Sequence, residues 1–139
     1  MNSTPQMTLS EILNKYKVEF EEDSKINEMN LRERQLMLPG IKHKYVAYLI
    51  QHKQQKYELE SAKRKAVAEL INQQQNPEIG LSRPAVERKQ EGHPTIKRIN
   101  EMMAEQDIII EYLEKIESIT KSMTYDMGNI IKIMEMETT

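Results

Sequence analysis

The feature of this sequence that most constrains its fold is the stretch 41–75, which contains neither proline nor glycine. These two residues are the strongest breakers of helices, so their absence predicts one long helix from Ile41 to about Gln75. Side chains that suit a buried face recur through the stretch at the three- and four-residue spacing of an α-helix. They are Ile41, Tyr45, Tyr48, His52, Leu59, Ala62, Ala66 and Leu70.

A second long helix is predicted after Pro94. It should run to about Thr124, with an extension to about Met136 through a weak point at residues 125–128. The segment 76–94 holds three prolines and two glycines and is predicted to be a connecting loop, with one helical turn at 85–89. Two long helices joined by a loop predict an antiparallel hairpin.

The amino-terminal part predicts two shorter helices. Residues 1–7 form a tail, and Thr8 with Glu11 makes a capping box at the start of the first helix. Residues 21–24 should end this helix and cap the next one, which should stop at Pro39 and Gly40. The predicted fold class is therefore all-α: a single helical domain over 8–139, with short amino-terminal helices and a hairpin of two long helices.

Charge is unevenly distributed along the chain, although the formal net charge is only −2. Residues 41–65 carry seven Lys or Arg and two Glu, a net charge of +5, whereas residues 101–139 carry nine acids and three bases, a net charge of −6. The basic middle and the acidic end indicate more about binding partners than the total does.

The bases of the middle segment form a stripe on the predicted helix, which we call the basic stripe. At about 100° per residue, five of them fall within roughly 100° of arc, and at about 1.5 Å per residue these five extend for some 33 Å. The five are Lys42, Lys53, Lys56, Lys63 and Arg64. A row of cations suits the phosphates of a nucleic acid. Tyr57 at its edge either packs in the core or is accessible and could stack on a base. A lysine-rich face that is only solvated is the alternative. The candidate DNA-binding residues are Lys42, Lys53, Lys56, Tyr57, Lys63, Arg64 and Lys65.

The second long helix is apolar on two sides. One side follows a heptad-like spacing, and the other contains Ile108, Tyr112, Ile119 and Ile133. Gln106 and Thr120 are polar positions in the heptad-like side, where they could set the register or the copy number of an oligomer. Unburied patches of this size mark interfaces, so residues 95–139 are predicted to hold a homo-oligomer together. The alternative is that the amino-terminal helices cover the second side. Residues beyond about Thr124 extend past the predicted end of the partner helix, so they should find little of their own chain to pack on. The candidate oligomerisation residues are Met123, Met127, Ile130, Ile131 and Met134.

No pattern of catalytic or metal-binding residues is present. The chain has no cysteine, and none of His43, His52 and His93 has a partner histidine at helical spacing, so we expect no enzyme, no metal and no cofactor. His52 lies on the apolar face and is interpreted as a packed histidine. No apolar run reaches the length of a membrane span, and the first residues are polar, so we expect a cytoplasmic protein.

Four short segments carry a further pattern: 23–26, 38–49, 63–66 and 126–132. Together they resemble the UvsY family of recombination mediators of T-even-type phages and their marine relatives, and the resemblance extends over residues 8–137. One departure concerns residues 67–70, which contain no base where the family has a basic motif associated with DNA binding.

The resemblance implies a mediator that binds single-stranded DNA as a ring-like homo-oligomer, such as a hexamer or heptamer. It also implies two protein partners, a phage recombinase and a single-strand DNA-binding protein, in the cytoplasm of the infected host cell. The resulting hypothesis is a protein without catalysis that helps to load the recombinase onto covered DNA. A structural oligomer or adaptor that acts only through protein–protein contacts is the alternative.

Overall fold

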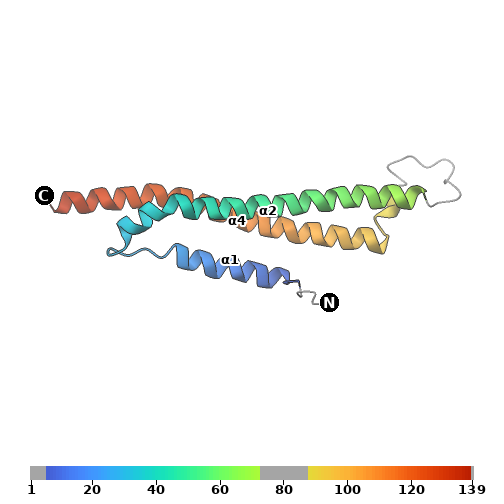
Figure 1. The fold of residues 1–139 in the computed structure, drawn as a ribbon, viewed down its shortest axis with the longest axis horizontal. Helices are drawn as coiled ribbons and strands as arrows, with labels where there is room; N and C mark the ends of the chain where they lie inside the picture. Colours follow the sequence, from blue (N-terminus) through green and yellow to red (C-terminus); the bar gives the residue numbers. More distant parts are fainter. Residues whose placement is uncertain (1–5, 73–87, 139) are drawn as a thin grey trace. The chain divides into compact units, whose positions relative to one another are not determined.

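A computed structural model of the protein describes residues 6–72 and 88–138, and the long elements in them are three α-helices (Figure 1). Helix α1 spans Leu9–Asp23, α2 spans Leu31–Asn72 and α4 spans Pro94–Glu137. Residues 88–90 form a further helical turn before α4, whereas most of the predicted loop lies outside the described residues. The prediction of an all-α fold is confirmed.

The chain divides into two compact units. One contains Met1–Gln51 and Ile109–Thr139, and the other contains His52–Ile108. Helices α2 and α4 each contribute to both units. Within the first unit, Leu38 near the start of α2 packs with Met127, whereas Leu49 further along packs with Ile109. The order of the contacts on α4 is thus reversed, and the predicted antiparallel hairpin is confirmed.

Helix α1 begins and ends close to its predicted positions. The Thr8 Oγ1 atom accepts a hydrogen bond from the Glu11 backbone N–H at 3.2 Å, which satisfies one of the unpaired donors at the helix start. The side chain of Tyr16 is buried in a core cluster with residues of α2 and α4. Three further apolar positions at helical spacing, Leu9, Leu13 and Phe20, pack against this cluster.

Polar contacts at the carboxyl end of α1 fix its position on α2. The Tyr45 hydroxyl donates to Asp23 Oδ2 at 2.9 Å, and the Tyr48 hydroxyl donates to Glu19 Oε1 at 2.9 Å. Lys44 Nζ lies 3.0 Å from Glu19 Oε1 and also pairs with Asp23. Because Tyr45 is only 1% exposed, its hydroxyl needs such a partner, and Asp23 supplies it.

The predicted helix boundary at Pro39 and Gly40 is wrong. Helix α2 already begins at Leu31 and continues through Pro39. Proline inside a helix costs about 3 kcal/mol, but Leu38 before it and Ile41 after it are both buried, and burying one such side chain contributes about 1.5–3 kcal/mol. Packing on both sides of the proline therefore outweighs the local preference.

The predicted cap for this helix is also wrong. Ser24 closes the end of α1 and starts no second helix. The turn that leads into α2 is instead built on Asn27, whose Oδ1 atom accepts from the backbone N–H groups of Met29 and Asn30 at 2.9 and 3.0 Å. Asparagine favours such turns because its short side chain can bond the backbone two or three residues ahead.

The carboxyl-terminal part of α4 is covered differently from the expectation. We expected residues beyond about Thr124 to find little of their own chain to pack on, and this is wrong. Met127 is buried with Leu31 and Leu38, because α2 extends further back than predicted. Met123 and Ile131 pack against the same cluster. Of the five candidate oligomerisation residues, only Ile130 and Met134 remain exposed, at 44% and 37%.

We predict that the folded protein loses stability as the pH rises above 10.0, the ordinary pKa of tyrosine. Burial and the hydrogen bond to Asp23 raise the pKa of Tyr45. The unfolded chain therefore gives up this proton first, so the stability from Tyr45 is complete below pH 10.0 and is lost above it. The loss should reach about 1.4 kcal/mol of unfolding free energy per pH unit.

Thermal unfolding followed by circular dichroism measures this loss. The variant Tyr45→Phe should show a shallower decline with pH than the wild type, because the titrating hydroxyl is absent. The variant Tyr57→Phe replaces an exposed ring and serves as the control. Equal declines in all three proteins would contradict the assignment to Tyr45.

Candidate nucleic-acid interface

All seven candidate DNA-binding residues lie on α2, and they differ in how accessible they are. Lys42 belongs to the first unit, whereas the other six belong to the second. Four of them are exposed: Lys53, Tyr57, Arg64 and Lys65. The remaining three, Lys42, Lys56 and Lys63, are partly buried.

Two lysines of the basic stripe already have carboxylate partners. Lys56 Nζ lies 2.7 Å from Asp107 Oδ1, and this contact raises the pKa of the lysine. Lys63 Nζ lies 2.9 Å from Glu91 Oε1. Glu91 also accepts a hydrogen bond from Asn100 Nδ2 at 2.7 Å, and the two contacts lower the pKa of its carboxyl group. A phosphate would have to displace these carboxylates before it could bind Lys56 or Lys63.

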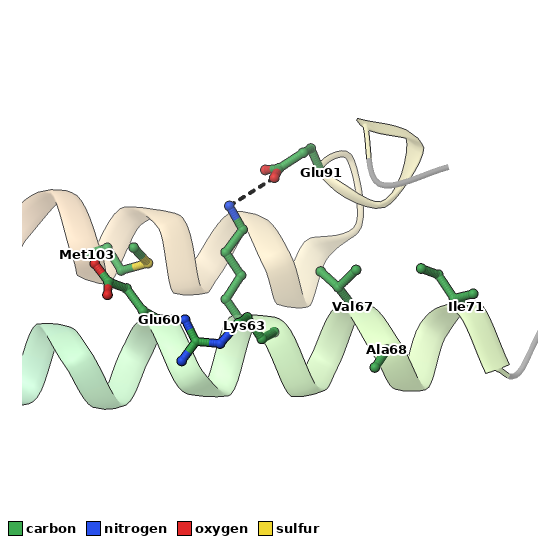
Figure 2. Close-up of a pocket in the computed structure, with 8 residues that line it drawn as sticks. Glu60, Lys63, Val67, Ala68, Ile71, Glu91 and Met103 are labelled. Atoms are coloured by element: carbon green, nitrogen blue, oxygen red, sulfur yellow. Dashed lines mark ion pairs between the residues drawn. The ribbon is translucent and has the colours of Figure 1, made fainter. Parts of the chain in front are cut away.

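A groove of about 470 Å³ adjoins Lys63. Figure 2 shows Lys63 reaching from α2 to Glu91, with Val67 and Ile71 further along the same helix. The segment without a base that departs from the family pattern supplies Val67 and Ala68 to this lining. The lining contains two carboxylates, two bases and several apolar side chains, so the groove has no excess of positive charge. Its lining consists of Glu60, Lys63, Arg64, Val67, Ala68, Ile71, Glu91 and Met103.

The accessible part of the basic stripe is a face with one aromatic ring and two bases. Tyr57 follows Lys53 by four residues and precedes Arg64 by seven, so the three side chains leave α2 within about 40° of arc. Tyr57 is 66% exposed. The sequence left open whether this ring is packed or accessible, and the structure places it at the surface. This cation–aromatic face can hold phosphates beside a stacked base.

The buried polar residues of the hairpin are paired within the chain. His52 is 5% exposed, and its Nδ1 atom lies 2.8 Å from Gln106 Oε1, so the interpretation of His52 as a packed histidine is confirmed. The Thr120 hydroxyl donates to the Glu117 backbone carbonyl at 2.8 Å. Gln106 and Thr120, which we considered as register positions between copies, are therefore satisfied inside one chain.

In residues 6–72 and 88–138, no group of three histidine or acidic side chains could hold a metal ion. None of the helices in this part of the chain is both long and apolar enough to cross a membrane.

Comparison with known proteins yields a match in fold. The structure is similar to the crystal structure of the bacteriophage T4 recombination mediator protein UvsY, with a TM-score of 0.76 and 12% sequence identity. The similarity covers 96% of this chain and 100% of the T4 chain. No family model matches the sequence, and no curated protein matches it. The resemblance seen in the sequence is thus confirmed at the level of the fold.

We predict that Glu91→Gln increases the affinity for single-stranded DNA. The substitution removes the carboxylate that pairs with Lys63 and keeps an oxygen for Asn100. One released lysine should make the slope of log K against log salt steeper by about 0.7. Fluorescence anisotropy with a labelled oligonucleotide at several salt concentrations measures both quantities.

The control for this prediction is Glu105→Gln. Glu105 is exposed on α4, and the substitution changes the net charge by the same amount without releasing a stripe lysine. If both variants shift the affinity equally, the effect comes from net charge alone, and the pairing of Lys63 with Glu91 does not limit DNA binding.

Proposed function

We propose that this protein is a recombination mediator without enzymatic activity. It binds single-stranded DNA and helps a strand-exchange recombinase to replace the single-strand DNA-binding protein that covers the strand. The observation that carries the proposal is the fold, which is similar to that of the T4 mediator over 96% of the chain. Its place of action would be the cytoplasm of an infected host cell.

The accessible cation–aromatic face supports binding of single strands in particular. Lys53 and Arg64 can neutralise phosphates, while Tyr57 offers an exposed ring to an unpaired base. Bases in a duplex are stacked on one another and cannot reach such a ring. Contacts to phosphates and to the face of a base carry little sequence information, as a mediator that acts on any strand requires.

Exposed apolar residues on α4 support self-association. Tyr112 and Ile110 pack against the core cluster that contains Tyr16 of α1, whereas Ile119, Ile130 and Ile133 are between 44% and 56% exposed. Ile119 and Ile130 are 11 residues apart, so both side chains leave α4 in nearly the same direction. Contact between copies would bury them. A ring-like hexamer or heptamer would also bring several cation–aromatic faces to one strand, which increases the apparent affinity.

The mediator role is tested by recombinase loading. The recombinase and the single-strand DNA-binding protein of the same source are mixed with a long single strand, and filament formation is followed with and without this protein. A shorter lag on covered DNA, with no change on bare DNA, is the expected result. A protein that binds DNA but leaves the lag unchanged would favour the alternative of a structural oligomer or adaptor.

We predict that replacing Lys63, Arg64 and Lys65 together with alanine weakens binding of single-stranded DNA. Each lost phosphate contact should reduce the salt slope by about 0.7, and helicity should be kept because alanine is the best helix former. Anisotropy titration and circular dichroism measure the two effects. Unchanged affinity and slope would mean that this part of α2 is an inert solvated face.

We predict that Ile130→Gln combined with Met134→Gln lowers the mass of the assembly in light scattering. Both residues are exposed and glutamine suits a helix, so the fold should persist. Truncation after Ser122 is less informative because it also removes the buried Met127. Leu36→Gln, at an exposed apolar position of α2, is the comparison. A loss of mass with Leu36→Gln alone would place the interface on α2.

A further inference from the structure

A second groove, in the first unit, has a lining that differs in charge from the groove beside Lys63. Its volume is about 460 Å³, and it lies between Lys42 of α2 and the carboxyl-terminal half of α4. Three lysines line it and no carboxylate does. The complete lining is Lys42, Lys121, Thr124, Tyr125, Gly128, Asn129 and Lys132.

The α4 side of this groove repeats the spacing of the cation–aromatic face on α2. Tyr125 follows Lys121 by four residues and precedes Lys132 by seven, as Tyr57 follows Lys53 and precedes Arg64. The three side chains of α4 therefore leave their helix within about 40° of arc as well. Over the 11 residues from Lys121 to Lys132 the helix rises by about 16 Å, so the two ammonium groups can serve different phosphates.

The cations of the second groove are more available than those beside the first. Lys42, Lys121 and Lys132 form no ion pair with any residue in the described parts of the chain, whereas Lys56 and Lys63 are held by carboxylates. The acid nearest in sequence, Asp126, lies in an adjoining hollow with Lys121 and Tyr125. Available cations without a facing carboxylate can bind phosphate without first losing a partner.

The middle position of the repeated pattern also differs between the two helices. Seven residues after the first lysine, α2 has Glu60 and α4 has Gly128. Glycine destabilises the interior of a helix, and packing does not explain it here, because nothing lies within 4 Å of the position that a Cβ atom would occupy. Gly128 leaves open space between Tyr125 and Lys132. A glutamate at this position, equivalent to Glu60 of α2, would place a negative charge there.

The ring of Tyr125 is 73% exposed, which is more than that of Tyr57. An exposed ring beside lysines offers a stacking surface to a base whose phosphates the lysines hold. An acidic peptide could also bind the three lysines, but it would have no use for the ring or for the open space at Gly128. The lining therefore favours a single nucleic-acid strand over an acidic protein segment.

We propose that this groove is a second binding site for single-stranded DNA. Lys42, Lys121 and Lys132 hold successive phosphates, and Tyr125 stacks on a base above the open space at Gly128. The proposal rests on the proposed function, since it assumes that the protein binds single strands. It adds a site on α4, in a region of the chain whose net charge is negative.

The test uses the full chain and a fluorescein-labelled oligothymidylate in anisotropy titrations at several salt concentrations. Lys121→Ala combined with Lys132→Ala should reduce the salt slope by about 1.4, which corresponds to two phosphates at about 0.7 each. The charge-matched control is Lys97→Ala combined with Lys115→Ala, on the same helix and outside the groove. This control should keep the wild-type slope.

The role of the ring and of the open space is tested separately. Tyr125→Ala should raise the Kd for oligothymidylate at least about fivefold, whereas Tyr125→Phe should keep the wild-type Kd. On an abasic strand, wild type and Tyr125→Ala should bind equally. Gly128→Gln should weaken binding by filling the space, and Gly128→Ala, which adds only a methyl group, should do so less.

The outcomes separate this proposal from the proposed function. A wild-type protein that does not bind the strand at low salt overturns the proposed function, and this proposal with it. If the wild type binds and the double lysine variants of groove and control behave alike, only the groove proposal is overturned. Light scattering identifies one further case: groove variants that lose assembly mass but keep their DNA affinity per subunit would make the groove a contact between copies, which also overturns it.

Discussion

The burial of the apolar face of α4 against α2 is the interaction on which the rest of the structure depends. Ile109, Leu113 and Ile116 are at most 1% exposed, and they pack with Tyr45 and Leu49. Each such side chain contributes about 1.5–3 kcal/mol, so sliding one helix along the other would expose several of them at once. Within the first unit the two helices are thereby held in one register, and this register decides which of their polar residues can meet there.

The side chains that lie opposite each lysine explain why the lysines of α2 are not equivalent. Lys56 lies opposite Asp107 and Lys63 lies within reach of Glu91, so both are paired. Lys42 lies instead in a part of the first unit where α4 presents lysines and a tyrosine. On a single helix drawn in isolation these three lysines look alike, because they share one side of α2. Their partners differ because α4 and the turn before it present acids at some positions and bases at others.

The amino-terminal segment shows how tertiary packing can override a local signal. Proline and glycine at 39–40 are typical of a helix end, yet α2 runs through them because Leu31 and Leu38 find a buried place beside Met127. The same extension covers the end of α4 and leaves Ile130 and Met134, not Met127, available to a second copy. Helix α1 in turn packs on α2 and α4 through Tyr16, and the second apolar side of α4 is partly buried at Tyr112 and exposed at Ile119.

The sequence by itself determined the helical class, the hairpin, the capping of α1 at Thr8 and the surface composition of α2. These follow from periodicity, helix breakers and capping, which act within a few residues of the chain. It also contained the pattern of Lys121, Tyr125 and Lys132 on α4. The sequence did not show that these residues form a basic groove, because the helix as a whole is acidic. The pairing of Lys56 and Lys63, the continuation through Pro39 and the groove at Gly128 were decided only by the tertiary structure. Each of them depends on which residues of α2 and α4 lie opposite one another, and that register is set by the sum of many buried contacts between distant segments rather than by any local sequence signal.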